Sequence, residues 1–362
     1  MIAVEPSGGE VTLLVAGEPD LLTGGNLYNR HLCASLASAG VQVAVTTTPS
    51  AQYPQVVIVD SIAISQGFPW IAARPAGTAA VALLHMLPSL HARSGAARLR
   101  WRRLEMAFLR RVDVAVVAGQ DLGRWLHRLG FVGRVHTIPP GKDGPQPPPD
   151  AAVGHRRRWG EELRLLCVAN WFPVKGLHVL IEALADLPGD VRLDLVGDPA
   201  VDPAYAQQVR EAIRRYHLED RVRVAGVVPP EEMGARYAAA DAFVLPSMFE
   251  GYPTALAEAL WFGLPVVATG VGGISDLVSG GVEGFLVPPG RPRPLAAALR
   301  RLRDDPALRR RLAAAAAVRG RSLPSWSETR AALQRLILSL LGQYSSFPAR
   351  SPDVILAPDV GP

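Results

Sequence analysis

The chain reads PSMFEGYPTALAEALWFGLP from Pro246 to Pro265, directly after the apolar run 242–245. Gly251 permits a tight turn, and Pro253 suits the first position of a helix, where a missing N–H costs no hydrogen bond. Gly263 and Pro265 are typical of the end of a helix. The stretch therefore predicts a strand, a loop, a short helix and a second strand, which is the repeating unit of a parallel α/β sheet.

The start of this short helix suits an anion. The free N–H groups of residues 252–256 and the helix dipole favour negative charge there, and a diphosphate fits. Glu258 lies in the second helical turn and leans back toward the helix start, and Glu250 lies in the loop just before it. Carboxylates repel phosphate, so we interpret the two glutamates as acceptors for sugar hydroxyls. Taken alone, such a pair is more often two solvated charges, so the surrounding sequence has to decide.

Short apolar runs alternate with helix-type runs on both sides of this unit. In the first half the expected strands are 11–16, 41–46, 56–59, 79–84, 112–117 and 135–138, with helices at 26–39 and 99–111. In the second half they are 164–169, 192–196, 221–225, 242–245, 265–268 and 284–287, with helices at 177–184, 294–303, 306–319 and 325–341. Nearly continuous apolar strands are typical of parallel sheets that helices cover on both faces.

The proline-rich segment 139–160 interrupts this alternation and marks a domain boundary. We expect an acceptor-binding first domain over 1–145, a linker over 146–160 and a donor-binding second domain over 161–324. A final helix over 325–344 is expected to pack back on the first domain, before a disordered tail over 345–362. The predicted fold is α/β, with two Rossmann-like, doubly wound parallel-sheet domains facing across a cleft. Ligands of such sheets bind beyond the carboxyl ends of the strands.

The composition limits the compartment and the partners. Two cysteines far apart in 362 residues, Cys33 and Cys167, indicate a reducing compartment and not a disulfide framework. Neither a membrane-spanning apolar run nor a secretory signal is evident, so a cytoplasmic protein is expected. The net charge of +5 is weak support for anionic partners, and an Arg-rich surface explains it equally well. No nucleic-acid motif stands out, so no nucleic acid is expected as a partner.

One stretch of the first domain combines arginines with apolar residues. The arginines are Arg93, Arg98, Arg100, Arg102, Arg103, Arg110 and Arg111. They alternate with Leu99, Trp101, Leu104, Met106, Phe108 and Leu109. A basic amphipathic helix on an anionic membrane is one interpretation, with a peripheral location at the inner membrane face. A helix packed by its apolar side, with its arginines in water, is the other.

Several motifs together resemble the retaining glycosyltransferase family 4, of the GT-B fold. The Glu-x7-Glu spacing of Glu250 and Glu258 is the family's motif. VANWFPVKG at 168–176 is similar to its diphosphate-binding strand, loop and helix. VGGISD at 271–276, GFLVPPG at 284–290, the pair Gly24-Gly25 and IPPGKD at 138–143 follow in the expected places. The resemblance covers about residues 11–340 and is more specific in the second domain than in the first.

The resemblance implies roles for individual residues. The catalytic candidates are Lys175, which neutralises the departing nucleotide, Glu250, and His85, which ends an apolar strand. The donor-binding candidates are Gly24, Gly25, Asn170, Lys175, Glu250, Gly251, Tyr252, Thr254, Ala255 and Glu258. Asn170 departs from the family, which often has an arginine there. An Asn supplies no charge, so Lys175 and helix dipoles suffice or another cation, Arg291 or Arg293, assists.

The implied activity is transfer of a sugar from a nucleotide-diphosphate-sugar to a hydroxyl acceptor with retention of configuration. The acceptor is a glycan, a lipid-linked molecule or a small molecule, and neither a metal nor another cofactor is expected. Three alternatives stay open. A GT-B sugar-nucleotide epimerase shares the architecture, and a catalytically degenerate nucleotide-sugar binding protein is consistent with Asn170. A nicotinamide dehydrogenase is a remote third, because Ser275 breaks the Gly-x-Gly-x-x-Gly pattern that begins at Gly270.

Overall fold

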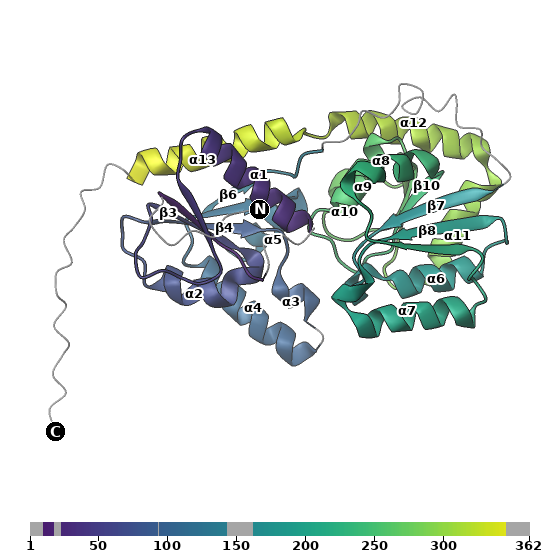
Figure 1. The fold of residues 1–362 in the computed structure, drawn as a ribbon, viewed down its shortest axis with the longest axis horizontal. Helices are drawn as coiled ribbons and strands as arrows, with labels where there is room; N and C mark the ends of the chain where they lie inside the picture. The colour runs from purple at the N-terminus through teal and green to yellow at the C-terminus, as the bar shows by residue number, and fades with distance from the viewer. Residues whose placement is uncertain (1–9, 18–22, 93, 143–161, 345–362) are drawn as a thin grey trace.

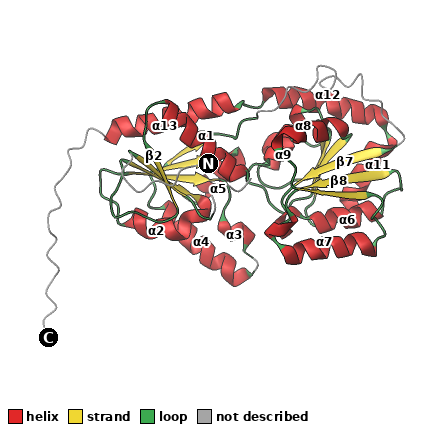
Figure 2. Ribbon diagram, in the orientation of Figure 1, coloured by secondary structure: helices red, strands yellow, loops and turns green. Residues whose placement is uncertain are grey.

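The computed structural model contains two α/β domains side by side, with two consecutive helices running along one side of both (Figures 1 and 2). It describes residues 10–17, 23–92, 94–142 and 162–344. The predicted linker at 146–160, the predicted tail at 345–362 and Arg93 lie outside the described residues.

Within the described residues, each domain contains one six-stranded parallel sheet. The first sheet comprises β1 (Val11–Leu14), β2 (Val43–Thr46), β3 (Val56–Asp60), β4 (Ala79–Leu84), β5 (Val114–Val117) and β6 (Arg134–Thr137). The second comprises β7 (Leu163–Val168), β8 (Val191–Val196), β9 (Val222–Gly226), β10 (Ala242–Leu245), β11 (Val266–Thr269) and β12 (Gly284–Val287). Every strand expected from the sequence is present within about two residues at each end, and the predicted fold is confirmed.

The helices cover both faces of each sheet. Those of the first domain are α1 (Gly24–Ser38), α2 (Ile64–Ala72), α3 (Pro88–His91), α4 (Gly95–Leu109) and α5 (Gln120–Arg128). Those of the second are α6 (Leu177–Ala185), α7 (Pro203–Arg215), α8 (Pro230–Ala239), α9 (Thr254–Trp261), α10 (Ile274–Leu277), α11 (Pro292–Asp304) and α12 (Pro306–Ser322). The last helix is α13 (Trp326–Tyr344), and short 3-10 turns occur at η1 (Ser61–Ala63), η2 (Pro173–Lys175) and η3 (Pro199–Val201). Within the described residues, no helix is long and apolar enough to cross a membrane.

Capping residues explain where the expected helix boundaries were wrong. Helix α4 begins four residues before the expected start at 99, because the Ser94 side chain accepts a hydrogen bond from the Ala97 N–H. Ser325 is not helical but caps α13. Its backbone N–H donates to Glu328, whose own N–H donates to the Ser325 hydroxyl, which is a capping box.

Strand order determines where the two sheets open toward ligands. The second sheet has the order β12-β11-β10-β7-β8-β9, so the chain winds one way from β7 and the other way from β10. The first sheet has the order β2-β1-β3-β4-β5-β6 and reverses between β1 and β3. Loops that leave the two strands at such a reversal diverge and leave a crevice between them. The loops after β7 and β10, and those after β1 and β3, therefore position the site residues.

The final helix α13 lies on the first domain, beside α1 (Figure 1). Trp326, Leu333, Ile337 and Leu340 of α13 are buried with Leu32 of α1 in one core cluster. The crossing is tight, because a Cβ on Gly141 would lie 2.2 Å from the backbone nitrogen of Trp326. Helix α13 thus closes one face of the first sheet.

Leucines on the two sides of α13 test this packing. Leu340 is fully buried and Leu338 is 40% exposed. We expect Leu340→Ala to lower the free energy of unfolding by about 2–5 kcal/mol, because it leaves a cavity between α13 and the first sheet. The same change at Leu338 is expected to cost less than about 0.5 kcal/mol. Urea denaturation followed by circular dichroism measures both, and equal losses would show that α13 does not belong to the core of the first domain.

Candidate active site

A partly buried ion pair lies at the reversal point of the second sheet. Lys175 ends η2, after β7, and its Nζ lies 2.7 Å from Oε1 and 2.9 Å from Oε2 of Glu250, in the loop after β10. The Glu250 side chain is 7% exposed and that of Lys175 is 24% exposed. Two residues 75 positions apart therefore meet because their strands are neighbours in the sheet.

The backbones of the two loops hold this pair in place. The Met248 N–H donates to the Val174 carbonyl at 2.7 Å, and Gly176 adopts a φ of +66° with its Cα facing the Pro246 carbonyl. A Cβ on Gly176 would lie 2.3 Å from that oxygen, so only glycine fits there. The Ser247 hydroxyl donates to Glu250 Oε1 at 2.6 Å. Glu250 thus faces Lys175 in one fixed orientation.

Helix α9 follows the Glu250 loop and differs from expectation at its first residue. Pro253 is the N-cap, with a φ of −83° and a ψ of 89°, and the helix begins at Thr254. No side chain caps this end. The Leu256 N–H already donates to the Pro253 carbonyl at 3.1 Å and is not free for an anion. The predicted anion site over 252–256 is therefore limited to the backbone N–H groups that precede Leu256.

Glu258 lies one turn further along α9 and is held by a tyrosine. The Tyr237 hydroxyl, from α8, donates to Glu258 Oε2 at 2.7 Å. Burial raises the pKa of the Glu258 carboxyl, and the hydrogen bond from Tyr237 opposes that effect. Glu258 Oε1 makes no hydrogen bond within the described residues and is free to accept one from a ligand.

Asn170 serves the loop and not the ion pair. Its side-chain oxygen accepts a hydrogen bond from the Asp198 N–H at 3.1 Å, which ties the loop after β7 to the loop after β8. Arg291 and Arg293, the alternative cations, are both exposed. Among the described residues, no group of three His, Cys, Asp or Glu side chains is arranged to hold a metal ion.

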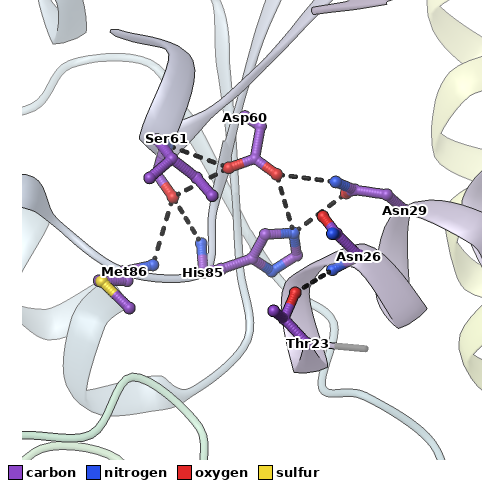
Figure 3. Close-up of polar contacts among 8 residues, drawn as sticks. Thr23, Asn26, Asn29, Asp60, Ser61, His85 and Met86 are labelled. Atoms are coloured by element: carbon purple, nitrogen blue, oxygen red, sulfur yellow. Dashed lines mark hydrogen bonds and ion pairs between the residues drawn. The ribbon is translucent and has the colours of Figure 1, made fainter. Parts of the chain in front are cut away.

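The first domain contributes His85, at the end of β4. Its Nε2 lies 3.1 Å from Oδ1 of Asn29, on α1, and 3.6 Å from Oδ2 of Asp60, at the end of β3 (Figure 3). Gly25 makes room for the imidazole, because a Cβ there would lie 3.2 Å from His85 Cδ2. Burial lowers the pKa of His85, and the nearby Asp60 partly opposes this.

The two domains touch at these same loops. A Cβ on Gly251 would lie 2.0 Å from the His85 carbonyl oxygen, and one on Gly24 would lie 3.4 Å from the Thr254 hydroxyl. The predicted residues of the first domain thus face those of the second.

A second interdomain contact lies beside α5. Asp276, on α10, accepts a hydrogen bond from the Asp121 N–H at 2.9 Å and pairs with Arg124 at 3.1 Å. Between the domains is a small pocket next to Glu250. Its walls are mainly apolar and comprise Leu87, Leu90, Asp121, Leu122, Trp125, Phe249, Glu250, Gly251 and Gly273.

Sequence reasoning missed the partners of the predicted residues. Ser247 and Asp276 lie inside the motifs quoted above, but nothing in those motifs indicates which atoms they contact. Tyr237, Asn29 and Asp60 lie in other elements and carry no motif. Asp60 gives the only signal of these three, since it is a carboxylate at the end of an apolar strand, where ligands of parallel sheets gather.

Known proteins resemble this chain in sequence. Residues 156–319 match the family model for glycosyl transferases group 1. The D-inositol 3-phosphate glycosyltransferase of Xylanimonas cellulosilytica is 34% identical over 232 residues, which are 61% of this chain and 55% of that protein. The putative colanic acid biosynthesis glycosyltransferase WcaL of Salmonella typhimurium is 38% identical over 149 residues, 39% of this chain and 36% of that protein. The chain thus spans about half, or less, of the length of these relatives.

Solved structures share the whole architecture. Sucrose-phosphate synthase from Thermosynechococcus elongatus superposes with a TM-score of 0.79, at 23% identity, over 92% of this chain and 99% of that one. HepE from Anabaena, in complex with UDP-glucose, has a TM-score of 0.72 at 22% identity, over 92% of this chain and 100% of that one. The resemblance to GT-B glycosyltransferases is confirmed, while membership of family 4 stays a prediction.

The Lys175–Glu250 pair generates a prediction that needs no substrate. Lys175→Met leaves the Glu250 carboxylate buried beside Ser247 without its cation. We expect this to lower the free energy of unfolding by about 1–3 kcal/mol, less than a fully buried pair because Lys175 is partly exposed. Adding Glu250→Gln should recover most of the loss. Urea denaturation of the two single variants and the double variant measures the coupling, and strictly additive losses would contradict it.

Proposed function

We propose that this protein is a retaining glycosyltransferase that moves a sugar from a nucleotide-diphosphate-sugar to a hydroxyl acceptor in the cleft. One observation carries the proposal: the Lys175–Glu250 pair lies at the reversal point of a Rossmann-order sheet, directly against the domain that carries His85. The match of residues 156–319 to the glycosyl transferases group 1 model and the names of the relatives support it.

The donor-binding proposal follows the fixed polar groups of the second domain. The Lys175 ammonium and the first amides of α9, at Thr254 and Ala255, face the diphosphate. Glu258 Oε1 accepts from the ribose hydroxyls, with Oε2 already held by Tyr237. Glu250 accepts from hydroxyls of the transferred sugar. Because Lys175 pairs with Glu250 beforehand, both charges stay fixed and compensated until the donor arrives.

The remaining candidates shape the cleft around the donor. Gly24 and Gly25 at the start of α1 allow the donor phosphates to approach the backbone closely. Gly251 and Tyr252 set the path of the loop between Glu250 and α9. His85 lies beside the transferred sugar, and Asn170 acts by holding the loop that bears Lys175.

The proposed reaction proceeds with retention and without a metal. The acceptor oxygen forms its bond to the anomeric carbon on the face from which the phosphate oxygen leaves, and its proton passes to a phosphate oxygen of the donor. The negative charge that develops on the nucleoside diphosphate is stabilised by Lys175 and the α9 amides. An epimerase needs the same donor site but no acceptor, and the names of the relatives favour transfer. A degenerate binding protein would hold the donor without turnover.

A membrane location is a separate proposal, based on α4. Arg98, Arg100, Arg102, Arg103, Arg110 and Arg111 are all exposed. The apolar residues of α4 differ in exposure. Phe108 and Leu109 are buried in the core of the first domain, whereas Leu99 is 53% exposed. We propose that α4 contacts an anionic membrane mainly through its arginines, at the cytoplasmic face, where a lipid-linked acceptor would reach the cleft.

Donor binding can be measured without knowing the acceptor. We expect UDP-sugars, screened first because HepE is solved with UDP-glucose, to raise the melting temperature by mass action. Glu258→Gln keeps the size of the side chain but removes the charge that accepts from the ribose. It should weaken donor binding by about 10- to 100-fold. Glu182→Gln, on α6, is the matched control. If no nucleotide sugar shifts the melting temperature of the wild type, the proposed function is wrong.

Turnover separates the alternatives. With the bound donor and a panel of hydroxyl acceptors, NMR of the product is expected to show the anomeric configuration of the donor. An inverted product would contradict retention, and epimerised donor without transfer would identify an epimerase. A donor that binds but is never consumed would leave the binding protein as the answer.

Vesicle co-sedimentation tests the role of α4. We expect binding to anionic vesicles at low salt that falls steeply with ionic strength, since each surface arginine contributes about 1 kcal/mol. The triple change Arg98→Glu, Arg100→Glu and Arg103→Glu should abolish it.

The matched control for this experiment lies on the other domain. Arg310, Arg311 and Arg321 of α12 are also exposed, and their change to Glu alters the net charge by the same amount. Equal loss in both triple variants would indicate that net charge, and not α4, governs binding.

A further inference from the structure

A chain of hydrogen bonds in the first domain leads from a buried carboxylate to His85 (Figure 3). Asp60 is 1% exposed at the end of β3. Its Oδ1 accepts from the Ile62 N–H at 3.0 Å and from the Ser61 hydroxyl at 3.4 Å, and its Oδ2 accepts from Asn29 Nδ2 at 2.8 Å. Both oxygens of Asp60 therefore act as acceptors, as those of a carboxylate do.

This carboxylate determines which way the Asn29 amide faces. An amide turned by 180° would place its oxygen against Asp60 Oδ2, with two acceptors and no hydrogen between them. The observed orientation is thus the one that Asp60 allows. It directs Asn29 Oδ1 at His85 Nε2, 3.1 Å away.

The amide orientation in turn determines the His85 tautomer. Asn29 Oδ1 has no hydrogen to donate, and Asp60 Oδ2, at 3.6 Å, has none either. Nε2 must therefore carry the hydrogen, and in the neutral ring Nδ1 keeps a lone pair. Burial lowers the pKa of His85, which favours the neutral form. Within the described residues, Nδ1 makes no hydrogen bond. It is also not one of the fully buried polar atoms without a partner, so it is not sealed off from a ligand.

The His85 residue lies where the two domains touch. The imidazole packs under Gly25 at the start of α1, and the His85 backbone touches Gly251, the neighbour of Glu250. Figure 3 shows Nδ1 turned away from Asp60. The ring thus presents an acceptor, with a buried negative charge behind it, toward the space assigned to the transferred sugar.

We propose that Asn29 and Asp60 are positioning residues that hold His85 as its Nε2–H tautomer, so that Nδ1 accepts a hydroxyl of the transferred sugar and excludes a carboxylate from that place. The selection between donors rests on the proposed function, whereas the tautomer of His85 does not depend on it. The donors selected are nucleotide hexoses with a hydroxyl facing His85, in preference to nucleotide uronic acids. A carboxylate there would meet a lone pair and the field of Asp60, and its own charge would be desolvated without a partner.

The tautomer is measured directly by nitrogen-15 NMR of protein labelled at histidine. His85→Gln identifies the His85 signals among those of the eight histidines. At neutral pH we expect the pattern of a neutral ring protonated at Nε2. An Nδ1–H ring or an imidazolium would overturn the proposal, whatever the enzyme does. His127→Gln, an exposed histidine on α5, is the matched control that should leave the His85 signals unchanged.

Variants test whether the relay sets the tautomer. Asp60→Asn keeps the shape of the side chain but adds a donor, so the Asn29 amide is no longer held in one orientation. We expect the His85 signals to become those of a mixture of tautomers. Asn29→Asp places a second carboxylate beside the ring and should convert it to the imidazolium. Unchanged signals in both variants would overturn the relay, and cooperative thermal unfolding followed by circular dichroism verifies that each variant is folded.

Specificity is tested with paired donors that differ only in a hydroxymethyl or a carboxylate group. In the wild type we expect kcat/KM for the hexose to exceed that for the uronic acid by about 10- to 100-fold, the effect of one unpaired buried polar group. In Asn29→Asp the imidazolium should remove most of this ratio. Equal use of both donors by the wild type would overturn the specificity. If UDP and both donors fail to bind while the tautomer is as expected, the proposed function fails and the relay stands.

Discussion

The cleft depends on the contact of Gly251 with the carbonyl of His85. A side chain at position 251 would collide with that oxygen at 2.0 Å, so the loop that bears Glu250 reaches the end of β4 only because it has a glycine there. The loops behind it are equally close. Cβ atoms on Gly272 and Gly273 would lie 2.1 Å from the carbonyl oxygens of Glu250 and Gly251. Backbone touches backbone through this region, and the polar side chains are positioned by that packing.

The architecture could be predicted because short stretches of the sequence indicate each strand and helix. Apolar runs, prolines and glycines indicated every strand found in the described part of the chain and the alternation that joins them. Strand order, which brings Lys175 and Glu250 together, is not local and was observed only in the structure. The first residue of α9 was misplaced, because a proline fits both the N-cap and the first helical position. The capping choices of Ser94 and Ser325 were likewise settled by hydrogen bonds that the sequence does not display.

The partners of the site residues could not be predicted, for a physical reason. Tyr237 reaches Glu258, and Asn29 reaches both Asp60 and His85, through contacts between elements that lie far apart in the chain. Such contacts depend on helix orientation and on side-chain rotamers, which no spacing rule encodes. The predicted site residues lie in motifs that the sequence displays, whereas Tyr237, Asn29 and Asp60, which hold them in place, lie outside those motifs. The charged groups of the cleft each have a fixed partner: Lys175 pairs with Glu250, and Asp60 accepts a hydrogen bond from the Asn29 amide.

The return of α13 to the first domain has a consequence for biosynthesis. Trp326, Leu333 and Leu340 complete the core on one face of the first sheet, yet the ribosome makes them only after the whole second domain. At about 5–20 residues per second, the roughly 200 residues between the end of the first domain and the end of α13 take about 10–40 s to synthesise. Throughout that interval the apolar face of the first sheet beside α1 lacks its cover. The nascent chain therefore exposes an apolar surface until α13 has been made, and an early stop codon within the second domain leaves both domains incomplete.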